Sequence, residues 1–220
     1  YSLTSVNTTT TADITALEIT EITGSFTVAD KMYDGTTAAS VQTRTLTGVL
    51  AGDVANVSLS GGTATFADAN VGLGKTVTLT GATLTGAAAG NYSLTSVNTT
   101  TANITALGLT GHFAATNKVY DGTNSASVQT RTLTGVLAGD LGNVSLSGGT
   151  ATFADANVGL GKTVTLTGAT LTGAAAGNYS LTSVNTTTAN ITALGLTGHF
   201  AATNKVYDGT NSASVQTRTL

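Results

Sequence analysis

Two stretches of the sequence have the residue types of a phosphate-binding loop. ANVGLGKT occupies residues 69–76 and again residues 156–163, and it resembles the pattern G-x-x-x-x-G-K-[ST]. Ala69 and Ala156 stand where that pattern has its first glycine. A phosphate-binding loop also opens a helix whose N-terminus faces the phosphates, whereas the alternating sequence TVTLTG that follows is typical of a strand. We therefore interpret these glycines as hairpin residues and expect no nucleotide site.

Histidine and aspartate are the other candidates for catalysis or metal binding. His112 and His199 occupy the same position in two copies of a repeat, and the first copy has Ser25 there, so neither histidine is expected to be a catalytic group or a ligand. The aspartates that recur are Asp34, Asp53, Asp68, Asp121, Asp140 and Asp155. They form no DxDxDG loop, which leaves calcium as a minor alternative to turn residues. We predict that the protein is not an enzyme and has no cofactor or metal site.

The tripeptide YDG occurs three times and predicts a structural turn. Glycine adopts a positive φ that other residues resist, and an aspartate side chain can bond its own nearby backbone. A catalytic Tyr/Asp pair is the alternative, but no general base or nucleophile accompanies the tripeptide at a recurring position. The predicted turn residues are Tyr33, Asp34, Gly35, Tyr120, Asp121, Gly122, Tyr207, Asp208 and Gly209.

The sequence has no cysteine, so packing and backbone pairing must stabilise the fold without disulfides. An isopeptide crosslink is a weaker possibility for a protein under tension. Its candidate residues are Lys162, Asn178 and Asp121. The sequence by itself does not bring these side chains together.

The whole chain is organised by a long internal repeat. Tyr33, Tyr120 and Tyr207 are each 87 residues apart. Residues 92–133 and 179–220 are identical, and residues 33–92 match 120–179 with four differences. A period of this length fits a small domain with its own core better than one coil of a solenoid. The predicted divisions are the C-terminal strand of a preceding unit at 1–13, a first unit at 14–103, a second at 104–190, and the N-terminal part of a third at 191–220.

Within a unit, apolar and polar residues alternate with a period of two between glycines and asparagines. In KTVTLTG, Val164 and Leu166 are predicted to point one way and the neighbouring threonines the other. About seven or eight such segments follow one another along residues 104–190, which favours an antiparallel Ig-like β-sandwich. The predicted fold is all-β, with small sandwich domains arranged end to end; a β-grasp-like repeat module is the alternative.

Charge and hydropathy limit the partners. The formal net charge is −3 without a run of one sign, which gives no electrostatic footprint for nucleic acid or an anionic membrane. No apolar run reaches the roughly 18 to 20 residues of a membrane helix, so we expect no membrane insertion. The start, YSLTSVNTTTTAD, lacks the regions of a signal peptide, and we interpret the sequence as an internal fragment. We expect the last thirty residues to fray unless they dock on the preceding unit or on another chain.

One ordered set of segments resembles a known family. KVYDGT is followed by LxGVLAGD, FADxNVGxGKTV, LxGAxxGNYSL and TxxANIT. This set resembles the YDG-type repeat of large bacterial surface and secreted adhesins, including filamentous-haemagglutinin-like proteins. The resemblance covers Lys31 to about Asn103 and Lys118 to Asn190, while residues 14–30, with additional residues around ITEITG, depart from the later units.

The resemblance implies a tandem all-β module of an exported protein, and it carries no catalytic residues. We therefore predict a structural spacer, or stalk, in an extracellular adhesin at the bacterial surface or secreted from the cell. Its expected partners are the neighbouring repeat units. The alternative is a multivalent module that binds host or cell-surface glycans or proteins.

Overall fold

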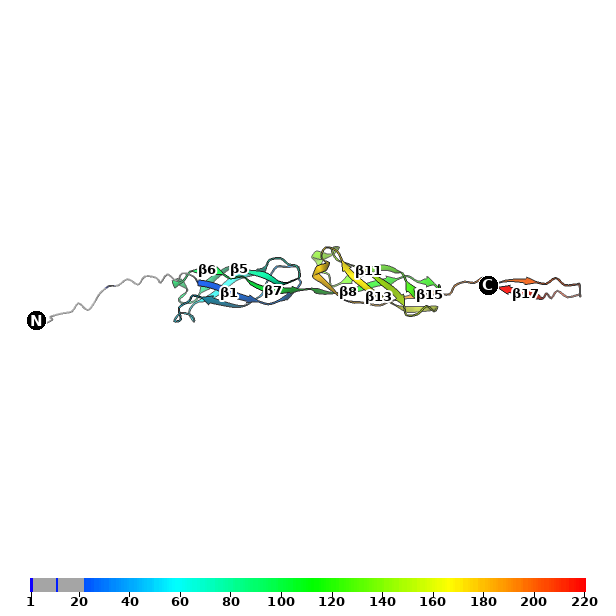
Figure 1. The fold of residues 1–220 in the computed structure, drawn as a ribbon, viewed down its shortest axis with the longest axis horizontal. Coiled ribbons are helices and arrows are strands. Elements are labelled where there is room, and N and C mark those ends of the chain that lie inside the picture. Colours follow the sequence, from blue (N-terminus) through cyan, green and yellow to red (C-terminus); the bar gives the residue numbers. More distant parts are fainter. Residues whose placement is uncertain (2–10, 12–21) are drawn as a thin grey trace. The chain divides into compact units, whose positions relative to one another are not determined.

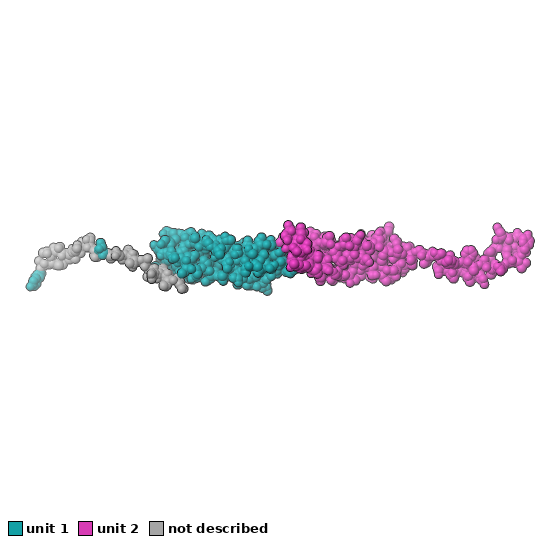
Figure 2. Space-filling view, turned by 90° about the horizontal axis from the view of Figure 1, so that it is seen from above, with its two compact units in different colours: residues 1–107, 177–179 teal, residues 108–176, 180–220 magenta. Residues whose placement is uncertain are grey.

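The computed structural model describes Tyr1, Thr11 and residues 22–220. Its contacts divide the chain into two compact units, coloured separately in Figure 2. Unit 1 comprises residues 1–107 with 177–179, and unit 2 comprises residues 108–176 with 180–220. The predicted strand at 1–13 and the predicted start of the first unit at 14–21 lie outside the described residues apart from Tyr1 and Thr11. The predicted repeat boundaries therefore stay a prediction.

Unit 1 is built from strands that form two sheets (Figure 1). One sheet has the order β3-β1-β6, and the other has the order β2-β7-β5-β4. A short 3₁₀ turn, η1 (Ala89–Asn91), precedes β6. The strands are β1 (Ile22–Val28), β2 (Lys31–Met32), β3 (Val41–Thr47), β4 (Ser58–Phe66), β5 (Gly72–Thr85), β6 (Leu94–Val97) and β7 (Thr100–Thr105).

Unit 2 repeats this arrangement with the sheets β11-β8-β14 and β10-β12-β13-β15-β9. Its 3₁₀ turns are η2 (Ala138–Asp140) and η3 (Ala176–Asn178). Its strands are β8 (Leu107–Ala115), β9 (Lys118–Val119), β10 (Ser125–Ala126), β11 (Val128–Thr134), β12 (Ser145–Phe153), β13 (Gly159–Thr172), β14 (Tyr179–Val184) and β15 (Thr187–Thr192). No helix in the described part of the chain is long and apolar enough to cross a membrane.

The strand registers of the two units correspond residue for residue. Ser58 pairs with Thr85 between β4 and β5, and Ser145 pairs with Thr172 between β12 and β13, 87 residues further on in each strand. These strands place a threonine or serine on the exposed face and an apolar residue on the other, as the period of two predicts. Val164 and Leu166 are buried and Thr165 between them is exposed, which confirms that prediction.

The sheets are mixed, so the prediction of purely antiparallel pairing is wrong in part. β1 pairs with β6 in parallel, and the short strands β2 and β9 pair in parallel with β7 and β15. The paired segments are far apart in the sequence, and the long connections between them allow a parallel arrangement that a short hairpin turn cannot give. Alternation within a strand shows which residues share a face. Parallel and antiparallel strands alternate in the same way, so the pattern does not predict the pairing direction.

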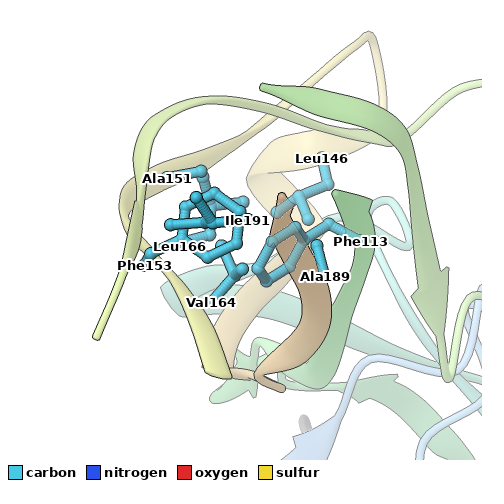
Figure 3. Close-up of a cluster of buried hydrophobic side chains, with 8 residues drawn as sticks. All are labelled: Phe113, Leu146, Ala151, Phe153, Val164, Leu166, Ala189 and Ile191. Carbon is cyan, nitrogen blue, oxygen red and sulfur yellow. The ribbon is translucent and has the colours of Figure 1, made fainter. Parts of the chain in front are cut away.

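The core of unit 2 lies where side chains from its two sheets meet (Figure 3). Phe113 of β8 belongs to one sheet, and the other sheet contributes most of the cluster. Val164 and Ile191 are fully buried, and Phe153 is 2% exposed. The buried cluster is Phe113, Leu146, Ala151, Phe153, Val164, Leu166, Ala189 and Ile191.

Residues 199–219 form a separate antiparallel hairpin, β16 (His199–Ala202) with β17 (Val215–Thr219). Every residue from 192 to 220 is exposed. Local antiparallel pairing joins the two strands of this hairpin, and the expectation that the segment frays stays a prediction. The register is that of β8 with β11: His199 pairs with Thr219 as His112 pairs with Thr132.

Candidate functional site

The YDG turn of unit 1 is organised around the ammonium group of Lys31. Lys31 Nζ donates to Asp34 Oδ1 at 2.7 Å, to the Thr36 carbonyl oxygen at 2.7 Å, to Thr36 Oγ1 at 3.1 Å and to the Ala38 carbonyl oxygen at 3.1 Å. The Lys31 side chain is 16% exposed, whereas Asp34 is 53% exposed. The lysine thus satisfies its charge with oxygens of the turn, and the turn is closed around it.

The turn itself follows from the residues between the lysine and the threonine. Gly35 has a φ of 76°, a conformation that residues with a Cβ rarely adopt. Asp34 Oδ1 accepts a hydrogen bond from the Thr36 backbone N–H at 2.8 Å and another from Thr36 Oγ1 at 2.9 Å. The hydrogen bond from Lys31, with further help from Thr36, lowers the pKa of Asp34 from 3.8 to about 2. Asp34 is therefore a charged, hydrogen-bonded turn residue at neutral pH.

The same geometry occurs in the other two YDG turns. Lys118 Nζ donates to Asp121 Oδ1 at 2.7 Å, and Lys205 Nζ donates to Asp208 Oδ1 at 2.7 Å. In each case the lysine also donates to the carbonyl and hydroxyl oxygens of the threonine that follows YDG. Gly122 and Gly209 have φ values of 80° and 75°. The spacing K-x-Y-D-G-T contains this information, although sequence reasoning singled out the tripeptide and missed the lysine two residues before it.

A second ion pair lies in the loop that resembled a phosphate-binding loop. Lys75 Nζ donates to Asp68 Oδ1 at 2.6 Å, and Lys162 donates to Asp155 Oδ1 in unit 2. The glycine three residues before each lysine begins a strand: β5 starts at Gly72 and continues for 14 residues. Each lysine, near the start of its strand, thus forms an ion pair with an aspartate of the preceding loop. This arrangement agrees with the interpretation as a hairpin and leaves no helix N-terminus for a phosphate.

The remaining sequence candidates are not brought together into a site. His112 is half-buried on β8, and its Nε2 lies 3.0 Å from Thr134 Oγ1. His199 is exposed on β16. Asp121 and Lys162, both proposed for an isopeptide crosslink, have different partners, Lys118 and Asp155. Among the described residues, no three His, Cys, Asp or Glu side chains lie close enough together to hold a metal ion.

A groove between β3 and β4 is a feature that sequence reasoning did not find. It is lined by Arg44 and Leu46 of β3, by the loop that follows β3, and by Leu59 of β4, and its volume is about 380 Å³. Arg44 lies along it with one guanidinium nitrogen donating to the Gly61 carbonyl oxygen at 3.0 Å. The only hint of this groove in the sequence is that an arginine recurs after 87 residues. Its hydrogen-bond partner is a backbone carbonyl, which the amino-acid sequence does not identify.

Unit 2 has the same groove, and Arg131 has the same partner type, the Gly148 carbonyl oxygen at 3.1 Å. The volume here is about 270 Å³. Leu141 lines this groove where unit 1 has the smaller Val54, in keeping with the smaller volume.

The four sequence differences between residues 33–92 and residues 120–179 fall at these two places. Thr37/Asn124 and Ala38/Ser125 immediately follow the lysine-centred turn, and Val54/Leu141 and Ala55/Gly142 lie in the loop beside the groove. Before residue 33 the units differ further: β1 reads ITGSFTV where β8 has LTGHFAA, and the buried Ile22 corresponds to Leu109. Turns and loops are where connecting segments tolerate change and where binding residues commonly lie.

Comparison with known proteins identifies one family. The family model described as YDG domain matches residues 15–102 and again residues 100–189. The two matches follow the internal repeat, and each includes one complete lysine-centred turn and one groove. No curated protein and no solved structure matches the chain.

Proposed function

Because the chain belongs to the YDG domain family, we propose that it is a structural spacer in a bacterial adhesin that is displayed at the cell surface or secreted. In this proposal each unit is an Ig-like two-sheet sandwich, and successive units follow one another in tandem. Each additional unit then increases the distance between the cell and a binding region elsewhere in the adhesin. The role is mechanical and requires no reaction.

The observation that carries the proposal is the conservation of internal geometry from one unit to the next. Strand registers and the lysine-centred turn are reproduced with an 87-residue offset. A spacer depends on such uniformity, because its length is the sum of equal parts. The function of an enzyme or a ligand-specific domain depends on a single site, so such a protein does not need to repeat its entire fold.

Scattering from chains with different copy numbers tests the proposal. Deletion of residues 92–178 removes one 87-residue period and rejoins identical sequence, and insertion of a further period adds one. We expect the maximum dimension measured by small-angle X-ray scattering to change by the same increment for each period. A compact particle whose dimension is independent of copy number would overturn the spacer function.

The groove supports a second candidate, a multivalent module that binds glycans or matrix proteins. An arginine guanidinium, exposed apolar groups and loop variation occur together at this groove in both units, and two weak sites on one chain give avidity. The test is binding of the chain to a glycan array and to a panel of matrix proteins. If the unaltered chain binds and an Arg44→Ala/Arg131→Ala double variant does not, the binding-module function is supported. If the unaltered chain binds nothing, the spacer function is the one that stands.

A further inference from the structure

The groove beside Arg44 lies along a free sheet edge. β3 ends the sheet β3-β1-β6, and β11 ends the corresponding sheet β11-β8-β14 of unit 2. Within the described part of the chain, β1 is the only strand that pairs with β3, and β8 is the only one that pairs with β11. Every second residue of an edge strand turns its backbone N–H and C=O away from its neighbour. A further strand can pair with these groups.

The chain itself extends the edge of the facing sheet in this way. In unit 2 the short strand β10 pairs with Ala151 and Thr152 of β12. In unit 1 the Ala39 N–H donates to the Ala64 carbonyl oxygen of β4 at 3.0 Å. These contacts cover only the last residues of β4 and β12. The groove remains beside the first residues of β4, which include Ser58.

Arg44 and Leu46 give the groove one charged and one apolar position. They are two residues apart on β3, so their side chains share a face. Arg44 donates to the Gly61 carbonyl oxygen through one nitrogen, and its guanidinium group has further N–H donors. No ion pair among the described residues involves Arg44 or Arg131. Val54, which is 62% exposed, adds apolar surface to the same groove.

The charge of Arg44 opposes pairing between two copies of the chain at this edge. Arg44 is the central residue of β3, so two β3 strands that pair antiparallel about their centres place their arginines opposite each other. Like charges in that position destabilise a strand pair, and a charge on an edge strand commonly prevents such pairing. The same guanidinium group attracts a carboxylate. The occupant that fits the charge of this edge is therefore an acidic segment of a different protein.

We propose that the free edges of β3 and β11 each bind, by strand addition, an extended segment of another protein in which a carboxylate and an aliphatic side chain are two residues apart. The carboxylate pairs with Arg44 or Arg131, and the aliphatic side chain packs on Leu46 or Leu133. Main-chain hydrogen bonds supply affinity in this mode, and the alternate side chains supply specificity. The inference rests on the second candidate function and specifies its partner as an acidic peptide.

A short synthetic peptide tests the proposal on the whole chain. The probe is acetyl-Thr-Val-Thr-Asp-Thr-Val-Thr-amide, which puts valine, aspartate and valine on one face and has the same order of residues in both directions. It is titrated into the ¹⁵N-labelled chain and followed by amide NMR and calorimetry. We expect saturable binding of two peptides per chain, with shift changes concentrated in β3 and β11. No saturable binding up to about 5 mM peptide, or shift changes confined to other strands, would overturn the proposal.

Altered peptides separate the two kinds of contact without changing the protein. Asparagine in place of the aspartate is expected to weaken binding by about fivefold or more, because a charge-assisted hydrogen bond becomes a neutral one. Equal affinity would refute recognition of the carboxylate. Two further peptides are N-methylated, one on the valines and the aspartate and the other on the inner threonines. At least one of them should lose binding, and full binding of both would refute strand addition.

Substitutions in the protein assign the two sites. Arg44→Gln and Arg131→Gln chains are each expected to bind one peptide, and the double variant none. Lys75→Gln is the matched control, because it removes the same charge outside the groove and should leave both sites. A double variant that binds two peptides as tightly as the unaltered chain would overturn the proposal. A chain that binds glycans but not the peptide would refute this inference alone, and the scattering test of the spacer is independent of both.

Discussion

The ammonium group of Lys118 lies 5.7 Å from the centre of the Phe153 ring. Lys31 and Phe66 repeat this distance in unit 1. Phe153 belongs to the buried cluster, while Lys118 closes the YDG turn at the surface. The lysine therefore joins a surface turn to the core through a cation–π contact and a set of hydrogen bonds. In the hairpin, Lys205 keeps its hydrogen bonds, but its side chain is 35% exposed compared with 16% for Lys118.

Replacement of Lys118 by methionine is expected to destabilise unit 2 by about 2 kcal/mol. The variant keeps much of the apolar stem but loses the charge-assisted hydrogen bonds to Asp121 and Thr123 and the contact with Phe153. Urea unfolding followed through amide NMR signals of unit 2 measures the change. Lys205→Met is the matched control, because it removes the same hydrogen bonds from a hairpin that packs on no sheet. Equal effects of the two substitutions on unit 2 would contradict the role assigned to the core contact.

The stability of unit 2 is expected to decrease at acid pH through Asp121. The hydrogen bond from Lys118, followed by those from Thr123, lowers the pKa of Asp121 from 3.8 to about 2. A group whose pKa is lower in the folded state stabilises the fold above its unfolded pKa, and this contribution is lost as the pH falls through the folded value. The contribution is thus complete above about pH 5 and disappears towards about pH 2.

Urea midpoints of the unaltered chain and of Asp121→Asn, measured from pH 2 to 7, test this assignment. The difference between the two chains should be largest at neutral pH and should shrink as the pH falls. A difference that stays constant over this range would show that the carboxylate charge is not responsible.

The sequence predicts the strands well, because the alternation within each segment shows which of its residues face the core and which face solvent. Val164 and Leu166 are in the core, as KTVTLTG predicts. Such local patterns do not contain the pairing direction, and β1 with β6 is parallel although the segments alternate like any antiparallel strand. Pairing of this kind depends on how distant segments pack against one another.

The candidate sites were harder to predict because many of their partners are backbone oxygens. Lys31 binds the carbonyl oxygens of Thr36 and Ala38, and Arg44 binds that of Gly61. Every residue has a carbonyl, so residue types do not distinguish the ones that become acceptors. The YDG tripeptide was recognisable because its glycine and aspartate have conformational preferences of their own.

Phe113→Ala and Phe200→Ala form a matched pair of substitutions in identical sequence. Phe113 is 7% exposed within the core of unit 2, so its truncation is expected to cost about 3 to 5 kcal/mol. Phe200 is 72% exposed, and its truncation is expected to change the stability of unit 2 by less than about 0.5 kcal/mol. Urea unfolding measures both. Similar losses would mean that the hairpin packs on unit 2 of its own chain.

Gly86→Ala tests a close approach between two backbone segments. Gly86 has a φ of 117°, and a Cβ at this position would overlap the carbonyl oxygen of Asn56. Both the backbone conformation and the overlap oppose a side chain, and neither the Gly86 backbone nor the Asn56 carbonyl can move without disturbing the hydrogen bond from the Ala88 N–H to that oxygen, 3.1 Å long.

We expect Gly86→Ala to destabilise unit 1 by about 2 to 4 kcal/mol in urea unfolding. Gly90→Ala, four residues further on, is the control. A Cβ there meets nothing within 4 Å and Gly90 has no positive φ, so alanine is expected to be neutral or slightly stabilising through the unfolded chain. If Gly86→Ala were as stable as Gly90→Ala, the contact between residues 56 and 86 would not hold this end of unit 1 together.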